Sequence, residues 1–476
     1  MPKFKSKKKS KPGTKNSRDS TLSLKERLTK KRKAQQARKE LIQFITVSIF
    51  LSTVLGIVLG LAVSPKVGVA ALAIPCFGFA YKYPRKAIWV FLIYLPISGT
   101  VTYWIGKGNI VFQLAKDGFY IPALIALVQY CQKKRLPILI PKGLKPTLGI
   151  LLVFCLMTLL VVNGSQQITH SESGQPLLMG LLGLKVFLGY IPLIFCAYYL
   201  IRSKKQLLFL TRLQVVLAII CGVLGFMQYM MLRTGICAGT DHLTGSDLFK
   251  ATLDAKCFVG GSLVYSPSQN VIRLPGTFVA PWQWAWFLIS NAFFTFATAF
   301  NDPSPFWRIS GLIGMAVVLV NAVISGQRIA LALVPIIVVI LLVLTGQVAN
   351  LKRFIPIGLG LALILGIAAA VNPEVVQERI DSFIGRWEAS PPQAFIQGQF
   401  DWAIRQQQGL LGRGLGRATN SARTFGETEL VETYYPKVLY EVGPFGTLAF
   451  LALVTSLTVI IFKTYRSIKD KNLRGM

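Results

Sequence analysis

The sequence predicts an all-α integral membrane protein that crosses a bilayer many times. Apolar residues make up 53% of the 476 positions and charged residues only 15%, which is too little charge to coat a soluble domain of this size. Apolar segments of about 20 residues, the length at which a helix crosses the hydrocarbon core, recur along the whole chain. These observations exclude a soluble globular protein.

Twelve transmembrane helices are predicted from the apolar runs and the charges that flank them. They cover residues 41–62, 67–81, 87–104, 111–131, 147–162, 177–200, 207–230, 279–300, 309–324, 328–345, 354–371 and 438–462. Together they define a transmembrane domain at 41–462, preceded by a disordered polybasic tail at 1–40 and followed by a short tail at 463–476. No internal repeat stands out, which disfavours the inverted-repeat transporter folds.

The distribution of cations predicts the orientation of the chain. Residues 1–40 carry sixteen Lys and Arg, and the cationic loops at 82–86, 132–145, 202–205 and 351–353 fall on the same side. Because cytoplasmic loops are enriched in Lys and Arg, both termini are predicted to be cytoplasmic. The long loops at 231–278 and 372–437 then face the other, extracytoplasmic side.

This pattern also accounts for the net charge of +33. A charge of that size attracts nucleic acid when it forms a patch, but here it follows the membrane topology, so no nucleic-acid partner is predicted. The basic tail is instead expected to contact anionic membrane lipid. Docking of a cytoplasmic protein is the alternative.

The ionisable residues Lys116, Asp117 and Lys185 lie inside predicted spans. Lys116 and Asp117 lie near the outer boundary of the fourth span, and Lys185 lies within the sixth. Since an ionisable group at such depth is costly, these residues are candidate substrate-binding residues. The alternatives are that Lys185 pairs with Asp117 or extends to the interface.

Two arginines lie at the predicted outer ends of spans. Arg273 precedes the eighth span, and Arg328 opens the tenth. The positive-inside rule disfavours cations on this face, so both are candidates for holding an anion through bidentate contacts. The alternative is that they only extend from the helix ends to the interface.

The loop at 372–437 is predicted to contain two helical segments and a glycine-rich turn. Apolar residues recur at helical spacing over 376–387 and, less cleanly, over 395–403. These segments either pack on the bundle or form a lid or acceptor-binding surface. The turn GLLGRGLGRA follows no strand, which disfavours a dinucleotide site. Its amides, together with Arg413 and Arg417, are candidates for binding an anion.

Cysteine and histidine offer little further chemistry. Cys237 and Cys257 share one long loop and are candidates for a disulfide if that loop is extracytoplasmic. The two histidines, His170 and His242, do not make up a zinc site, and no HExxH or CxxC motif occurs. No metal or cofactor is predicted.

The order of four motifs resembles the O-antigen ligase and polymerase superfamily of bacterial membrane proteins. The motifs are RLPGTFVAP at 273–281, SGQR at 325–328, GLLGRGLG at 409–416 and ETYYPKVLYEVGPFG at 432–446. The resemblance covers roughly residues 110–462. It implies an all-helical fold of the C-type glycosyltransferase kind and an enzyme in the bacterial inner membrane.

The resemblance also implies a reaction. Such enzymes transfer a glycan from an undecaprenyl diphosphate carrier to a glycan or lipid acceptor on the outer face of the membrane, without a metal or nucleotide sugar. The family's diphosphate-binding arginines correspond to Arg273 and Arg328. The position of its loop histidine, which contacts the acceptor, is occupied by Glu432. A carboxylate at this position is expected to act as general base, and the departure leaves polymerisation or another glycan transfer open beside ligation.

Two other functions remain open at this point. One is transport of a small anion such as bicarbonate, along a path lined by Lys116, Asp117, Lys185 and Arg328. The other is a non-catalytic role with polysaccharide-assembly proteins, consistent with the basic tail. Glycan transfer in O-antigen-type or exopolysaccharide biosynthesis is the leading expectation, because the candidate residues are denser at the outer face than at the midplane.

Overall fold

The structure is a computed structural model in which most of the chain is described. The described residues are 24–63, 68, 71, 73–108, 110–138, 140–169, 174–237, 259–261, 263–266, 271–347, 391–469 and single positions between 366 and 388. The chain divides into two compact units, Met1–Phe79 and Ala80–Met476. All candidate site residues that the structure describes belong to the second unit.

The first unit is dominated by the 39-residue helix α1 (Leu24–Ala62). The prediction that residues 1–40 are disordered is wrong for residues 24–40, which are helical, while residues 1–23 lie outside the described part. The segment at 24–40 consists mostly of Lys, Arg, Gln, Glu, Leu and Ala, all strong helix formers. Because it continues an apolar helix, it also needs no nucleus of its own. Helix α3 (Ala73–Lys82) follows.

The helices between residues 84 and 200 are short or bent. They are α4 (Pro84–Thr100), α5 (Ile110–Lys133), α6 (Lys145–Met157), α7 (Gly164–Thr169), α8 (Pro176–Leu188) and α9 (Leu193–Leu200). Two π-helical turns, η1 (Val101–Ile105) and η3 (Thr158–Asn163), extend α4 and α6. Helices α8 and α9 meet at 42°, so the predicted sixth span is a bent pair rather than one straight helix.

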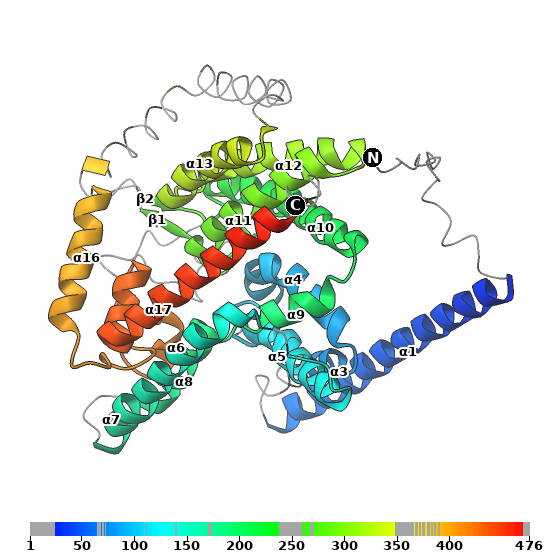
Figure 1. The fold of residues 1–476 in the computed structure, drawn as a ribbon, viewed down its shortest axis with the longest axis horizontal. Coiled ribbons are helices and arrows are strands. Elements are labelled where there is room, and N and C mark those ends of the chain that lie inside the picture. Colours follow the sequence, from blue (N-terminus) through cyan, green and yellow to red (C-terminus); the bar gives the residue numbers. More distant parts are fainter. Residues whose placement is uncertain are drawn as a thin grey trace, which may run out of the picture. The chain divides into compact units, whose positions relative to one another are not determined.

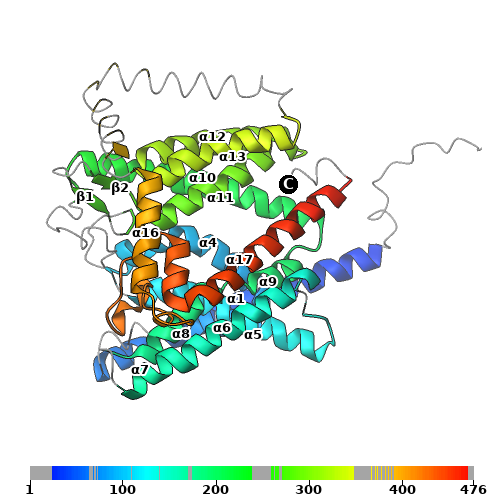
Figure 2. The same cartoon turned by 60° about the vertical axis from the view of Figure 1, so that its left-hand side comes forward.

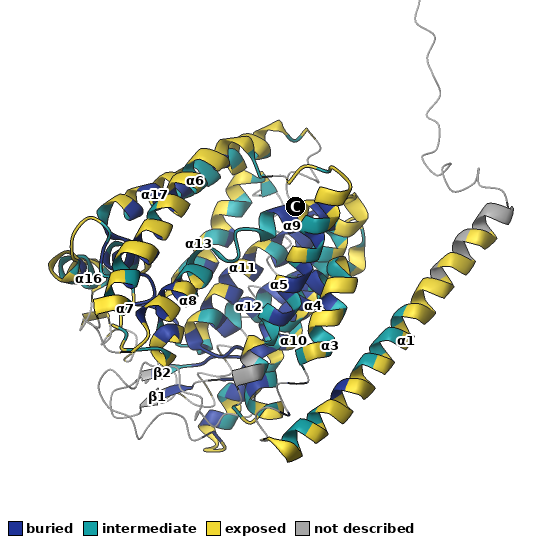
Figure 3. Cartoon of the chain, turned by 90° about the horizontal axis from the view of Figure 1, so that it is seen from below, coloured by how far each residue is buried: buried dark blue, intermediate teal, exposed yellow. Residues whose placement is uncertain are grey.

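Four helices of the second unit pack together, as Figure 1 shows. They are α10 (Lys204–Arg233), α11 (Pro281–Asn301), α12 (Pro305–Ile324) and α13 (Arg328–Leu344). Helix α11 is buried along most of its length, including Trp284, Leu288 and Phe296, and Figure 3 shows dark blue residues along it. Small residues let these helices approach, as is common in membranes: a Cβ at Gly311 of α12 would lie 2.6 Å from the backbone nitrogen of Ala299.

Local sequence signals explain where these helices begin. Proline occupies the first turn of α4, α6, α8, α11, α12 and α16, where its missing N–H costs nothing. Ser203 caps α10 by accepting the N–H of Gln206. An ion pair joins the start of α10 to the end of α11, with Arg212 Nε and Nη2 donating to the Asp302 carboxylate at 2.8 and 2.9 Å.

Two short strands and two further helices also belong to the second unit. Strands β1 (Val264–Ser266) and β2 (Val271–Arg273) form an antiparallel pair, with Val264 opposite Arg273. This small sheet is a minor addition to an all-α fold, as predicted. Helix α16 (Pro392–Gln406) confirms the second helical segment predicted in the large loop, and it stands beside the start of α17 (Tyr434–Ser467) in Figure 2. Most of the other predicted segment, 376–387, lies outside the described residues.

The long apolar helices make this a membrane protein of the α-helical class. Six described helices are long and apolar enough to cross a bilayer, or seven spans result if α8 and α9 count as one. The six are Gln35–Ala62, Pro84–Ile105, Lys142–Thr169, Lys204–Arg233, Pro305–Ile324 and Tyr434–Ser467. One of them extends to Thr169, so the loop predicted to begin at 163 is shorter than expected.

The other predicted spans are not among these six helices, for reasons that can be identified. Helices α5 and α11 have 24 and 21 residues but carry polar side chains, among them Asp117 and Asn291, that lower their hydropathy. Helix α13 has 17 residues and α3 only 10. The predicted span at 354–371 lies mostly outside the described residues.

Candidate functional site

Two backbone segments that are distant in the sequence are joined next to the candidate arginines. The N–H of Leu274 donates to the carbonyl of Ser325 at 2.9 Å. Gly326 has φ +66°, and a Cβ there would lie 1.7 Å from the carbonyl oxygen of Ile272. Strand β2, which ends at Arg273, therefore lies directly against the turn that precedes Arg328 at the start of α13.

The segment after Arg273 is buried and fixed by hydrogen bonds. Residues 274–280 are all buried. The carbonyl of Thr277 accepts the N–H groups of Gly99 at 2.9 Å and Thr100 at 3.2 Å, and Gln228 Nε2 donates to the carbonyl of Gly276 at 3.1 Å. The motif RLPGTFVAP is thus a packed connection between α4, α10 and α11, and it holds Arg273 in place.

The three residues proposed to act together are electrostatic neighbours. Burial lowers the pKa of the Arg273 guanidinium, nearby Glu432 acts in the opposite direction, and Arg328 lowers it further. Arg273 and Arg328 are both half-buried, whereas Glu432 is exposed. Arg273 therefore lies close enough to Arg328 and Glu432, which follow it by 55 and 159 positions in the sequence, for their charges to act on it.

Glu432 is positioned by helix α16. Its backbone N–H donates to Gln399 Oε1 at 3.2 Å. Two residues later, Tyr434 begins α17. The partial desolvation expected of a general base is not present at Glu432 in the free protein, so a bound donor and acceptor would have to cover this carboxylate.

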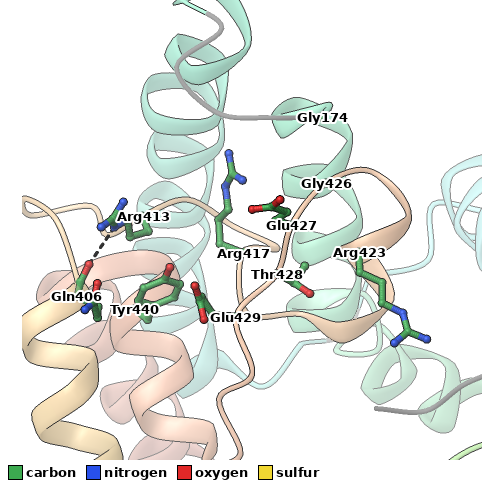
Figure 4. Close-up of a pocket in the computed structure, with 10 residues that line it drawn as sticks. All are labelled: Gly174, Gln406, Arg413, Arg417, Arg423, Gly426, Glu427, Thr428, Glu429 and Tyr440. Carbon is green, nitrogen blue, oxygen red and sulfur yellow. Dashed lines mark hydrogen bonds between the residues drawn. The ribbon is translucent and has the colours of Figure 1, made fainter. Parts of the chain in front are cut away.

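A cavity of about 720 Å³ lies in the large loop, with its wall drawn in Figure 4. The lining residues are Gly174, Gln406, Arg413, Arg417, Arg423, Gly426, Glu427, Thr428, Glu429 and Tyr440. Arg413 and Arg417, predicted as anion-binding residues, are both on this wall. The ten lining residues do not include Arg273, Arg328 or Glu432, so these three residues do not share this cavity with Arg413 and Arg417.

The glycine-rich turn is held by buried polar side chains. Asn163 Nδ2 donates to the carbonyls of Pro176 at 3.0 Å and Leu415 at 3.1 Å, and its Oδ1 accepts the Leu415 N–H at 2.9 Å. The carboxylate of Glu441, only 3% exposed, accepts the Ala418 N–H at 2.8 Å and the Thr419 hydroxyl at 2.9 Å. Two sides of the turn are thus fixed to different helices.

Gly412 and Gly443 are positions where only glycine fits, because their backbones lie in close contact. Gly443 interrupts α17 with φ 74° and ψ −177°, and a Cβ there would lie 2.7 Å from the nitrogen of Gly412. Gly412 also has positive φ, at 74°. Since L side chains rarely adopt this conformation, both glycines are needed where the turn crosses the bend in α17.

Gln166 forms hydrogen bonds with both Arg413 and Arg417, the two arginines predicted to bind an anion. Gln166 Nε2 donates to the carbonyl of Arg413 at 2.9 Å, and Gln166 Oε1 accepts from Arg417 Nη2 at 3.0 Å. Arg413 Nε donates in turn to the carbonyl of Gln406 at 2.9 Å, the bond dashed in Figure 4. The two guanidinium groups are therefore positioned before any ligand binds.

The intramembrane charges form a separate cluster. Lys185 Nζ lies 2.7 Å from Asp117 Oδ2, and the Tyr190 hydroxyl donates to Asp117 Oδ1 at 3.2 Å. Lys116 interacts electrostatically with both Asp117 and Lys185. The pairing of Lys185 with Asp117, one of the alternatives for these residues, is what the structure contains.

The remaining predicted residues divide between the described and undescribed parts. Cys237 is disulfide-bonded, while Cys257 lies outside the described residues. His170 and His242 also lie outside them. Within the described part, no group of three or more His, Cys, Asp or Glu is placed to hold a metal ion.

Sequence reasoning did not single out several residues of this region. Glu427, Glu429 and Tyr440 line the cavity, and Gln166 orients its arginines. One signal was available: Glu441 is an acidic residue inside the predicted span at 438–462, and an ionisable residue within a span is by default a functional hypothesis. The loop carboxylates carry no such signal, because acidic residues are ordinary in solvated loops.

Comparison of the chain with family models, curated proteins and solved structures found no match.

Proposed function

We propose that this protein is a membrane glycosyltransferase that polymerises or ligates glycans from an undecaprenyl diphosphate-linked donor, on the outer face of a bacterial inner membrane. The observation that carries the proposal is the hydrogen bond between Leu274 and Ser325, which joins the segments that carry Arg273 and Arg328, with Glu432 close enough to act on the pKa of Arg273. Arg273 and Arg328 match the diphosphate-binding arginines that the resemblance to the O-antigen ligase and polymerase superfamily implies, and Glu432 occupies the position of that superfamily's loop histidine. Their proximity provides an anion-binding pair beside a carboxylate.

The two arginines suit a diphosphate leaving group. Guanidinium groups bind phosphate oxygens through charge-assisted, often bidentate contacts. Arg328 is the first residue of α13, so the positive end of that helix adds to the attraction for an anion. Partial burial of both side chains strengthens the interaction relative to open water. Stabilising the charge that develops on a leaving group in this way is typically worth a factor of about 10² to 10³ for one donor.

Glu432 suits activation of the acceptor. In the proposed step the acceptor hydroxyl oxygen forms a bond to the anomeric carbon as the bond from that carbon to the diphosphate oxygen breaks. The hydroxyl proton passes to the Glu432 carboxylate, and the bond electrons leave with undecaprenyl diphosphate. General-base assistance of this kind contributes about 10² to 10⁴. The step inverts the configuration at the anomeric carbon.

The predicted outward orientation agrees with the cysteine chemistry. Cys237, in the loop before β1, is disulfide-bonded, and disulfides persist in oxidising compartments outside the cytoplasm. The loop carrying Arg273 would then face the same side as the lipid-linked donor.

A substitution at Arg328 tests the proposal in cells. Arg328→Ala removes one of the two guanidiniums, and we expect surface polysaccharide to be lost while the protein remains in the membrane at its normal level. Arg233→Ala, at the end of α10, is the matched control because the proposal gives that arginine no role. Polysaccharide of unchanged length and yield in the Arg328 variant would exclude the proposal.

A second candidate function is transport of a small anion. It rests on the bend of 42° between α8 and α9, a feature shared with the broken helices of some transporters, and on the Lys116, Asp117 and Lys185 cluster beside it. Uptake of a labelled anion into proteoliposomes separates the two functions. Transport would tolerate Glu432→Gln, whereas glycan transfer would not.

A further inference from the structure

The cavity in the large loop is built for polar contacts. None of its ten lining residues is aliphatic, so its wall does not suit a lipid chain. Its volume, about 720 Å³, falls within the range of roughly 300–1,000 Å³ typical of small-molecule sites. It is therefore distinct in chemistry from any groove that would hold an undecaprenyl tail.

The wall presents hydrogen-bond donors and acceptors together. Arginine nitrogens donate only, carboxylates accept only, and the side chains of Gln406, Thr428 and Tyr440 can do both. A sugar hydroxyl both donates and accepts, so a wall with both kinds of partner satisfies it. A cavity lined by one kind alone would leave half of these bonds unmade.

The charges on the wall are nearly balanced. Three arginines face two carboxylates, Glu427 and Glu429, and Figure 4 shows the Arg423 side chain directed away from those of Arg413 and Arg417. A free anion entering this cavity would meet the two carboxylates as well as the arginines. The balance therefore favours an uncharged, hydroxyl-rich ligand over an anionic one.

Part of the wall is held in place before a ligand binds. Gln166 fixes Arg413 and Arg417, and Arg417 is only 6% exposed. The ring of Tyr440 lies 5.0 Å from that of Trp402, centroid to centroid. Preorganised contacts of this kind cost less entropy on binding.

The cavity also adjoins the proposed general base along the chain. Glu429 lines it, and Glu432 follows three residues later. Three extended residues span at most about 11 Å. The backbone of Glu432 therefore lies no more than about 11 Å from that of the wall residue Glu429.

From these observations we infer that the cavity is a binding subsite for an uncharged oligosaccharide, which serves as the acceptor. The role as acceptor rests on the proposed glycan transfer, whereas the binding of the oligosaccharide does not.

A binding experiment tests this inference. Oligosaccharides released from the surface polysaccharide of the source cells are separated by anion exchange into an uncharged and an anionic fraction. Each fraction is titrated against the full-length protein in lipid nanodiscs. Thr428→Trp fills the cavity, and Thr424→Trp places the same bulk on an exposed residue that does not line it.

We expect the uncharged fraction to bind the wild type and Thr424→Trp equally, and to bind Thr428→Trp at least tenfold more weakly. If Thr428→Trp does not fold, Glu427→Ala, at an exposed position, replaces it, with an expected loss of at least fivefold. No binding of the uncharged fraction, binding of the anionic fraction alone, or unchanged binding by the variant that folds would overturn the inference.

The Arg328→Ala variant separates this inference from the proposed function. It is expected to bind the oligosaccharide normally and to fail in transfer. Normal transfer by Arg328→Ala would remove the proposed function and leave the binding subsite standing. Loss of oligosaccharide binding in this variant would show that the subsite is not separate from the arginine pair and would overturn the inference.

Discussion

Leu274 donates its backbone N–H to the carbonyl of Ser325 at 2.9 Å, and this bond joins the two segments that carry the candidate arginines. Arg273 precedes the donor, and Arg328 follows the acceptor by three residues. Because the bond is between backbone atoms, the proximity of the two arginines does not depend on the flexibility of their long side chains. The pair is therefore a feature of the fold.

Gly326→Ala should separate these two segments. The alanine would have to adopt a positive φ, which costs about 1–2 kcal/mol, and its Cβ would clash with the carbonyl of Ile272. Gly346→Ala is the matched control, since Gly346 has φ +67° and no atom within 4 Å of its Cβ position. Both should lower the thermal midpoint, but only Gly326→Ala should reduce transfer, by at least tenfold, because small displacements of reacting groups cost about 10² in rate. Equal activity of the two variants would show that this contact does not position the site.

Glu441→Ala should destabilise the glycine-rich turn. It would leave the Ala418 N–H and the Thr419 hydroxyl without their acceptor, and each lost bond to a charged group costs about 1.5–3 kcal/mol. Glu441→Gln keeps an oxygen acceptor at the same place and should lose much less. Thermal unfolding in detergent, followed by tryptophan fluorescence, measures the difference. Similar midpoints for the alanine and glutamine variants would contradict the role assigned to this carboxylate.

The Lys185–Asp117 pair should behave as a structural contact. Lys185→Met leaves Asp117 half-buried without its ion pair, so the single variant should be destabilised, and adding Asp117→Leu should restore part of the loss. A double-mutant cycle on unfolding free energies is expected to give a coupling of about 0.5–3 kcal/mol. Glycan transfer should survive in the double variant. Loss of transfer there, with normal stability, would place this pair in the functional machinery.

Cys237 should resist alkylation until the protein is reduced. The structure has it disulfide-bonded, whereas Cys76, Cys131, Cys155, Cys196 and Cys221 are reduced cysteines. Maleimide labelling of the SDS-denatured protein, followed by peptide mass spectrometry, distinguishes the two classes. The unreduced sample is expected to yield one cross-linked peptide pair containing Cys237 and Cys257. Labelling of Cys237 without reductant would contradict both the bond and the extracytoplasmic placement of its loop.

Much of the helical framework was predictable because the signals are local. Helix α10 runs from Lys204 to Arg233 against a predicted 207–230, and α13 runs from Arg328 to Leu344 against a predicted 328–345. Apolar length, flanking charge and capping residues lie within each segment and fix its ends. The same reasoning failed at residues 24–40, where high charge predicted disorder but strong helix propensity and an adjoining apolar helix prevail.

From the sequence, site residues could be predicted only where the order of the motifs resembled that of a known family. The resemblance linked Arg273, Arg328 and Glu432, and electrostatic interactions connect all three. The cavity was not predictable, because its wall depends on contacts such as that between Asn163 and Leu415, which are 252 positions apart. Neither residue carries a local pattern that points to the other. That Glu432 does not line the cavity is likewise a property of the folded chain alone.

The proposed glycan transfer is measured as release of undecaprenyl diphosphate from a purified lipid-linked glycan by the protein in nanodiscs that contain an acceptor glycan. We expect release by the wild type without added metal or nucleotide sugar, with a loss of at least about 100-fold in Arg328→Ala and in Glu432→Gln. Release by both variants at the wild-type rate, or no release by the wild type with donor and acceptor present, would exclude glycan transfer by these residues.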